Sequence, residues 1–155
     1  MRTHPFNMAL QMTLLTPLMI PSACLWAADR NQSDEQAIVQ LEQRAERASP
    51  RDQCLRYTEL VSAMTDLAGK QMLDGDTEHA SAMFEKIKHY AELIHAGLAN
   101  DPKRVKDAQM IMHRTTYRLD EYLHQASSED RATLQATLNE LNQVQDELLT
   151  QVFKH

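Results

Sequence analysis

Apolar side chains recur at three- and four-residue steps along most of this chain, and that spacing constrains its fold more than any other feature. The segments 57–72, 80–98 and 105–123 match the 3.6-residue period of an amphipathic α-helix. A fourth segment, 134–152, has the most regular stripe. The 155 residues include only 3 Gly and 5 Pro, too few for the frequent turns of a β-sandwich or barrel. The sequence therefore predicts a single all-α domain.

Capping and helix-stopping residues divide the chain into five predicted helices. Ser33 with Gln36 forms a capping box that predicts a short first helix with a thin apolar stripe, ending near Ala48. Connections between the later helices are short, which favours antiparallel neighbours. We expect four long helices plus the weaker N-terminal one, arranged as an antiparallel helical bundle or a short stack of helical hairpins. The predicted starts of the long helices are Ser49-Pro50, Thr77, the Asn100–Pro102 segment and Ser127.

The first 28 residues differ from the rest and indicate an export signal. Arg2 and His4 form a weakly basic start, an apolar run follows over residues 8–20, and small residues precede the first acid, Asp29. The apolar run is shorter than the roughly 20 residues that span a bilayer. An uncleaved N-terminal anchor is the alternative. The predicted divisions are a signal peptide over 1–28, an N-terminal segment with a short helix over 29–48, and a helical bundle domain over 49–155.

The type of signal peptidase decides the fate of Cys24. Leu25 and Ala27 suit a general signal peptidase that cuts after Ala27 or Ala28, and this predicts a periplasmic or secreted protein. The four residues that end at Cys24, with Pro21 where Leu is usual, also resemble a lipobox. In that alternative the protein is a lipoprotein anchored through Cys24.

Cleavage would leave an acidic chain with one cysteine. Removing residues 1–27 takes away Arg2 and no acid, so 15 of the 16 Lys and Arg remain against 22 Asp and Glu, a formal charge of −7 in place of −6. This balance argues against nucleic acid or anionic lipid as a partner. Cys54 then has no partner for an internal disulfide, and its place beside an apolar stripe predicts a buried residue. We expect no membrane span in the mature chain.

One stretch carries the pattern of a known repeat. Within residues 60–93, Leu67-Ala68 supply a small-residue helix contact, Gly75-Asp76 supply a turn, and Ala80 and Phe84 occupy packing positions of a second helix. In these positions the stretch resembles one degenerate tetratricopeptide repeat, a unit that stacks to form binding grooves. Residues 51–155 are also similar to small exported helical proteins of bacteria, a likeness that brings no function with it. The departures from the repeat are Gln71, Ile87 and Glu92.

Two Glu-x-x-His pairs on successive predicted helices form the most distinctive chemical pattern. Such pairs hold two iron ions in ferritin-like bundles when they project into the core. On a helical wheel both pairs point away from the apolar faces, so we expect them to face solvent as surface neighbours. The pairs are Glu92 with His95 and Glu121 with His124, and Glu59 and Glu147 are further carboxylates on other helices.

Soft metal ligands occur in Met110-Ile111-Met112-His113. Met110 and Met112 are two positions apart, so they point to different sides of a helix, and Met112 is better explained as a core residue. The chain shows no Ser-His-Asp or Cys-His arrangement and no Gly-rich phosphate loop. We therefore expect no catalytic residues, no cofactor and no enzymatic activity.

These features favour an exported, non-catalytic helical binding or scaffolding module of the periplasm or cell envelope. The expected partner is another protein or a second copy of the chain, bound through apolar helix faces. The last helix is a candidate for self-association because its apolar seam continues to Val152 and Phe153. The alternative function is a small periplasmic protein that binds metal through His, Glu and Met.

Overall fold

The computed structural model describes residues 23–154, with side chains from residue 32 onward, and the regular structure within that range is entirely helical. The prediction of an all-α fold is confirmed. The elements are, in chain order, α1 (Ala23–Glu46), α2 (Pro50–Leu73), α3 (Thr77–Gly97), a short 3-10 helix η1 (Leu98–Asn100), α4 (Val105–Gln125) and α5 (Arg131–Val152).

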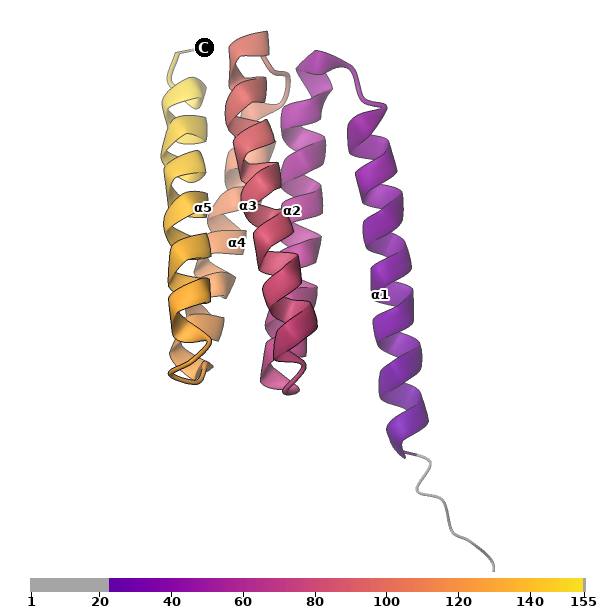
Figure 1. Cartoon of the computed structure of the whole chain (residues 1–155). Helices are drawn as coiled ribbons and strands as arrows, with labels where there is room; N and C mark the ends of the chain where they lie inside the picture. The colour runs from indigo at the N-terminus through magenta and orange to yellow at the C-terminus, as the bar shows by residue number, and fades with distance from the viewer. Residues whose placement is uncertain (1–22, 155) are drawn as a thin grey trace, which may run out of the picture.

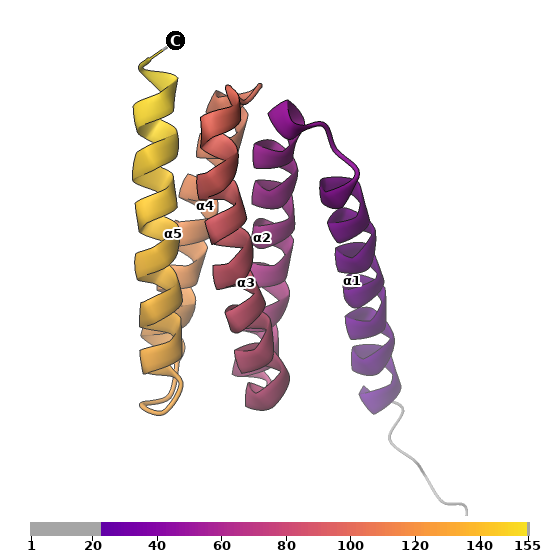
Figure 2. The same cartoon turned by 45° about the horizontal axis from the view of Figure 1, so that its top comes forward.

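Two antiparallel hairpins, α2–α3 and α4–α5, stack side by side (Figure 1). α2 packs against α4 and α3 packs against α5, so these four helices enclose a common core. α1 runs antiparallel to α2 and lies on the far side of α2 from α5 (Figure 2). The molecule is therefore a bundle of two stacked hairpins with one additional helix outside it.

The apolar stripes of α2 to α5 form the core. Phe84, Leu119 and Leu141 lie at the centres of three stripes, and none of their surface is exposed. Burying a side chain of this size stabilises the fold by about 1.5–3 kcal/mol. Other large side chains enclosed in the same core are Leu60, Met64, Ile87, Ile94, Met112, Leu134 and Leu148.

α2 packs closely against the side chain of Tyr122 of α4 at Gly69. A Cβ built on Gly69 would lie 2.2 Å from Cε2 of Tyr122, because the Tyr122 ring fills the space beside the glycine. Glycine inside a helix is about 1 kcal/mol less favourable than alanine. The packed ring of Tyr122 explains why this position of α2 has no side chain.

The predicted limits of α2 agree with the structure. Ser49 precedes the helix with an extended backbone, and Pro50 is the first helical residue. The Ser49 hydroxyl donates to Oδ2 of Asp52 at 2.6 Å, and the Asp52 N–H donates to the Ser49 carbonyl at 2.8 Å. After the helix, Gly75 has a φ of 88°, a left-handed conformation that glycine adopts without strain.

The predicted starts of α1 and α5 are wrong, whereas α3 begins at Thr77 as predicted. α1 begins at Ala23 and not at Ser33, because no Gly or Pro interrupts the segment and its alanines and leucine are good helix formers. α3 has Asp76 as its N-cap residue, one position before Thr77. The Ser127 hydroxyl accepts a hydrogen bond from the Asp130 N–H at 3.2 Å, but the α5 helix itself begins at Arg131.

α4 begins at Val105 and not in the Asn100–Pro102 segment. Asp101 precedes a proline, which disfavours the helical conformation, and its φ is 50°. Arg51 of α2 holds this connection: its Nε donates to the Asp101 carbonyl at 3.0 Å, and its own carbonyl accepts from the Lys103 N–H at 2.8 Å. The connection is thus bonded to the start of α2.

Candidate functional site

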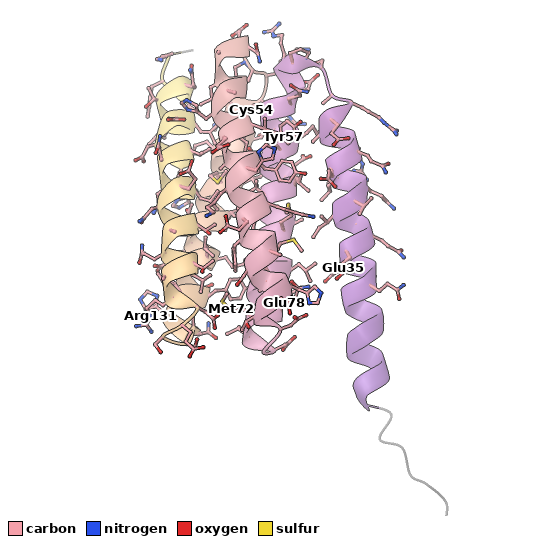
Figure 3. The ribbon with its side chains drawn as sticks, viewed as in Figure 1. Glu35, Cys54, Tyr57, Met72, Glu78 and Arg131 are labelled. Atoms are coloured by element: carbon pink, nitrogen blue, oxygen red, sulfur yellow. The ribbon has the colours of Figure 1, made fainter. Side chains whose placement is uncertain are left out.

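A cleft of about 240 Å³ lies between α1 and the α2–α3 hairpin. It exists because α1 has few large apolar residues: Ile38 and Leu41 are half-buried, and of the α1 side chains that the structure describes only Ala45 is fully buried. Figure 3 shows Glu35 on the side of α1 that faces the hairpin. The lining residues are Glu35, Ile38, Val39, Glu42, Met64, Gln71, His79, Ala82, Met83 and Lys86.

Gln71 is the polar side chain of α2 in the wall of this cleft. It is only 3% exposed, and its Oε1 is buried without a hydrogen-bond partner. Among the side-chain atoms that the structure describes, it is the one buried nitrogen or oxygen left in that state. An unpaired buried polar group of this kind costs about 1–3 kcal/mol.

Buried threonines in the same bundle show how such groups are usually satisfied. The hydroxyls of Thr58, Thr65 and Thr115 each donate to the carbonyl four residues earlier, at 2.8, 2.8 and 2.9 Å. Thr137 does the same at 3.0 Å. The core therefore pairs its small polar groups within a helix, and Gln71 stands apart from them.

Polar contacts hold α1 across the cleft. The Tyr90 hydroxyl of α3 donates to the Glu42 carboxylate, and the Tyr90 ring stacks on Tyr57 of α2 with centroids 5.7 Å apart. Burial, together with the bond to Glu42, raises the pKa of Tyr90 above its usual range. Lys70 of α2 lies 3.7 Å from the Asp34 carboxylate of α1. These contacts add specificity to a weakly apolar interface.

Charged groups of both signs surround the cleft. Glu35 and Glu42 of α1 face His79 and Lys86 of α3. His79 Nδ1 lies 2.7 Å from Oδ1 of Asp76, and that hydrogen bond raises the pKa of the imidazole. The rim therefore carries two carboxylates, one lysine and one histidine.

The two Glu-x-x-His pairs lie on the surface, away from the cleft. Glu92, Glu121 and His124 are exposed, and His124 Nδ1 lies 2.7 Å from the Asp120 carbonyl of its own helix. His95 is also exposed, but it reaches α5, where its Nδ1 lies 2.6 Å from Oε2 of Glu147.

The contact with Glu147 raises the pKa of His95, through the hydrogen bond first and charge attraction second. It joins one histidine to one carboxylate and does not bring the pairs together. Within residues 32–154, no three His, Cys, Asp or Glu side chains lie close enough to hold a metal ion.

The Met110–His113 segment of α4 divides between core and surface. Met112 has no exposed surface, whereas Met110 and His113 are exposed. Met110 and Met112 therefore point to different sides of the helix, as their spacing predicts. This arrangement does not offer two thioethers to one ion.

Cys54 is enclosed near the end of the bundle opposite Met72 and Glu78 (Figure 3). None of its surface is exposed, and burial raises the pKa of the thiol to about 11. A thiol that is both protonated at neutral pH and inaccessible is a poor nucleophile. Cys54 is therefore a core residue and not a reactive group.

The predicted export signal lies mostly outside the described residues. The structure gives no description of residues 1–22 or of the Cys24 side chain, so the signal peptide over 1–28, the uncleaved anchor and the lipid anchor all stay predictions. In the described part of the chain, each helix is too short or too polar to cross a bilayer.

No protein-family model, curated protein or solved structure matches this chain. Residues 60–93, which resemble a tetratricopeptide repeat, span parts of α2 and α3, and that resemblance stays a prediction.

Sequence patterns missed the cleft, although one signal for it was present. Gln71 follows Met64, Leu67 and Ala68 at helical spacing, so it lies on the buried stripe of α2. A long polar side chain on such a stripe indicates either a buried partner or a site. The cleft itself depends on how α1 lies against two other helices, and no local pattern encodes that.

Proposed function

We propose that this chain is an exported, non-catalytic binding module of the periplasm or cell envelope, and that its ligand occupies the cleft between α1 and the α2–α3 hairpin. Small-ligand sites are commonly concave and mainly apolar, with a few polar groups that fix orientation. The observation that most supports the proposal is the buried, unpartnered amide of Gln71 in the wall of the cleft. A bound ligand would supply the partner that the protein does not.

A photoreactive amino acid at Val39 tests this function in the native host. Val39 lines the cleft and is 50% exposed, so the probe would reach the ligand without entering the core. Asn142, an exposed residue of α5, is the matched control position. We expect a discrete mass adduct from position 39 and none from 142. Equal labelling from both positions, or no adduct from 39, would contradict the proposal.

Self-association through α5 is a second candidate, favoured by apolar surface at its C-terminal end. Phe153 is 81% exposed and Leu149 is 39% exposed, and α1 packs on α2 and does not cover them. Sedimentation equilibrium of the wild type and of Phe153→Ser tests it. A dimer that Phe153→Ser weakens supports the candidate, whereas a monomer at all concentrations rejects it.

A further inference from the structure

We infer that the cleft takes a neutral ligand of about ten non-hydrogen atoms, with a flat apolar ring system and one edge that carries both a hydrogen-bond donor and an acceptor, as in a lactam or primary amide. This ligand class presupposes the proposed function and adds the chemistry of the ligand. An apolar cavity of about 150 Å³ holds benzene. The cleft of about 240 Å³ therefore has room for a second ring or a substituent, but not for a helix of a partner protein.

The donor–acceptor edge follows from Gln71. Its amide offers one acceptor oxygen and two N–H donors, and no protein group among the described residues pairs with its side chain. Oε1 is enclosed, so it meets a ligand after the amide turns about its last torsion, which is a broad and low-cost rotation. A ligand with adjacent donor and acceptor can pair with the amide in either orientation, and a hydrocarbon can pair with it in neither.

The ring system follows from the apolar wall. Met64 and Met83 place two flexible thioether side chains in the cleft, opposite Ile38 and Val39 of α1. Methionine sulfur makes favourable contacts with the edges of aromatic rings, and the unbranched side chain adapts to their shape. Ala82 is small and leaves the α3 side of the cleft open.

The charges at the rim favour a neutral ligand. Glu35 and Glu42 oppose Lys86 and His79 around the same opening. Glu42 already accepts the Tyr90 hydroxyl, and His79 is paired with Asp76. A fatty acid would meet repulsion from the two carboxylates and a polyamine repulsion from Lys86, so the rim suits neither charge throughout.

Two probes of similar shape separate the contribution of the hydrogen bonds to affinity from that of the apolar contacts. We would titrate the full chain with isoquinolin-1-one, a lactam, and with naphthalene, its apolar analogue, while following the methyl NMR signals of Met64 and Met83. In the wild type the lactam should bind more tightly, by about tenfold, which is the typical value of a hydrogen bond to a buried group. Equal affinities for the two probes in the wild type, or methyl signals that neither probe moves, would overturn the ligand class.

A variant at Gln71 assigns the preference to its amide. Gln71→Met keeps the length of the side chain, and removing an unpaired buried amide should leave the protein at least as stable. The variant should lose the tenfold preference for the lactam, while Gln53→Met, elsewhere on α2, should retain it. A lactam preference that survives Gln71→Met refutes the role of the amide. The comparison of probes in the wild type remains decisive if the variant does not fold.

The crosslinking experiment at Val39 separates this inference from the proposed function. An adduct at Val39 without any lactam preference leaves the proposed function standing and rejects the ligand class. If the experiments show no adduct at Val39 and no methyl shift, both the proposed function and the ligand class are rejected.

Discussion

Cys54 shows how burial of one residue makes the stability of the molecule depend on pH. Its thiol has a pKa of about 11 in the folded protein, against an ordinary value of 9.0. Above pH 9 the unfolded chain loses this proton while the folded chain keeps it. The stability that this group contributes is therefore complete below pH 9 and is lost as the pH rises toward 11, by up to about 2–3 kcal/mol.

Denaturant unfolding of the wild type and of Cys54→Ala between pH 9 and 11 checks this expectation. The free energy of unfolding of the variant should fall less steeply. Burial also raises the pKa values of Tyr57 and Tyr90, so these tyrosines too lower the stability as the pH rises. Both proteins keep them, so they do not account for a difference between the two slopes. Parallel slopes for the two proteins would show that the thiol is not enclosed.

Single residues also test which face of each helix is buried. Truncating Phe84, Leu119 or Leu141 to alanine should lower the free energy of unfolding by about 2–5 kcal/mol, through lost burial and the cavity left behind. His95→Ala and His124→Ala should cost less than about 1 kcal/mol, since exposed ion pairs contribute little. Urea unfolding curves measure both classes. Similar losses in both would mean that the helix faces are wrongly assigned.

At the scale of elements, the contact between α2 and α4 depends on the missing side chain of Gly69. Gly69→Ala places a methyl group against the Tyr122 ring, and we expect a loss of about 1–3 kcal/mol in spite of the better helix propensity. Gly97→Ala is the matched control, because its Cβ would lie 3.8 Å from the Cys54 Cβ, an ordinary contact. Thermal unfolding should show Gly97→Ala neutral or stabilised. Equal effects at both glycines would contradict the close approach.

α1 is the element that we expect to open first. It packs mainly on α2, and Ala45 is its one fully buried residue among the side chains described. Local opening has a lower free energy where few apolar contacts hold a segment. Hydrogen exchange should therefore be faster in residues 32–46 than in the four-helix core, and Tyr90→Phe, which removes the bond to Glu42, should accelerate it further in α1 alone. Uniform protection across the five helices would refute this ranking.

Helical segments that bury many apolar side chains could be predicted from the sequence, and segments that bury few could not. α2 to α5 carry full stripes, so their existence and their buried faces followed from periodicity, including Phe84 and Met112. The first part of α1 carries no stripe, so periodicity did not predict its helix, although neither Gly nor Pro interrupts it. The start of α4 depended on the left-handed backbone at Asp101 and Arg104, which no spacing rule encodes. Gln71 was visible as a polar residue on a stripe, but its cleft required three helices to be placed together.

At the scale of the whole molecule, the predicted cleavage would leave the bundle and its cleft intact. Among the side chains that the structure describes, the first to line the cleft is Glu35 and the first fully buried one is Ala45, both well after Ala28. Removal of residues 1–28 should therefore leave the thermal midpoint of unfolding within about 2 °C of that of the full chain, since ΔΔG of 1 kcal/mol shifts such a midpoint by a few degrees. A larger fall would mean that the residues before Asp29 support the fold.

Intact mass of the protein purified from its native host tests the export prediction itself. We expect a mass that begins at Ala28 or Asp29, because small residues precede both positions and the apolar run ends before them. A mass that begins at Cys24 and includes a lipid would establish the lipoprotein alternative. A full-length chain in the membrane fraction would indicate the uncleaved anchor. A full-length chain in the cytosol would exclude export by any of these routes, and the proposed place of the binding module in the periplasm or cell envelope would fall with it.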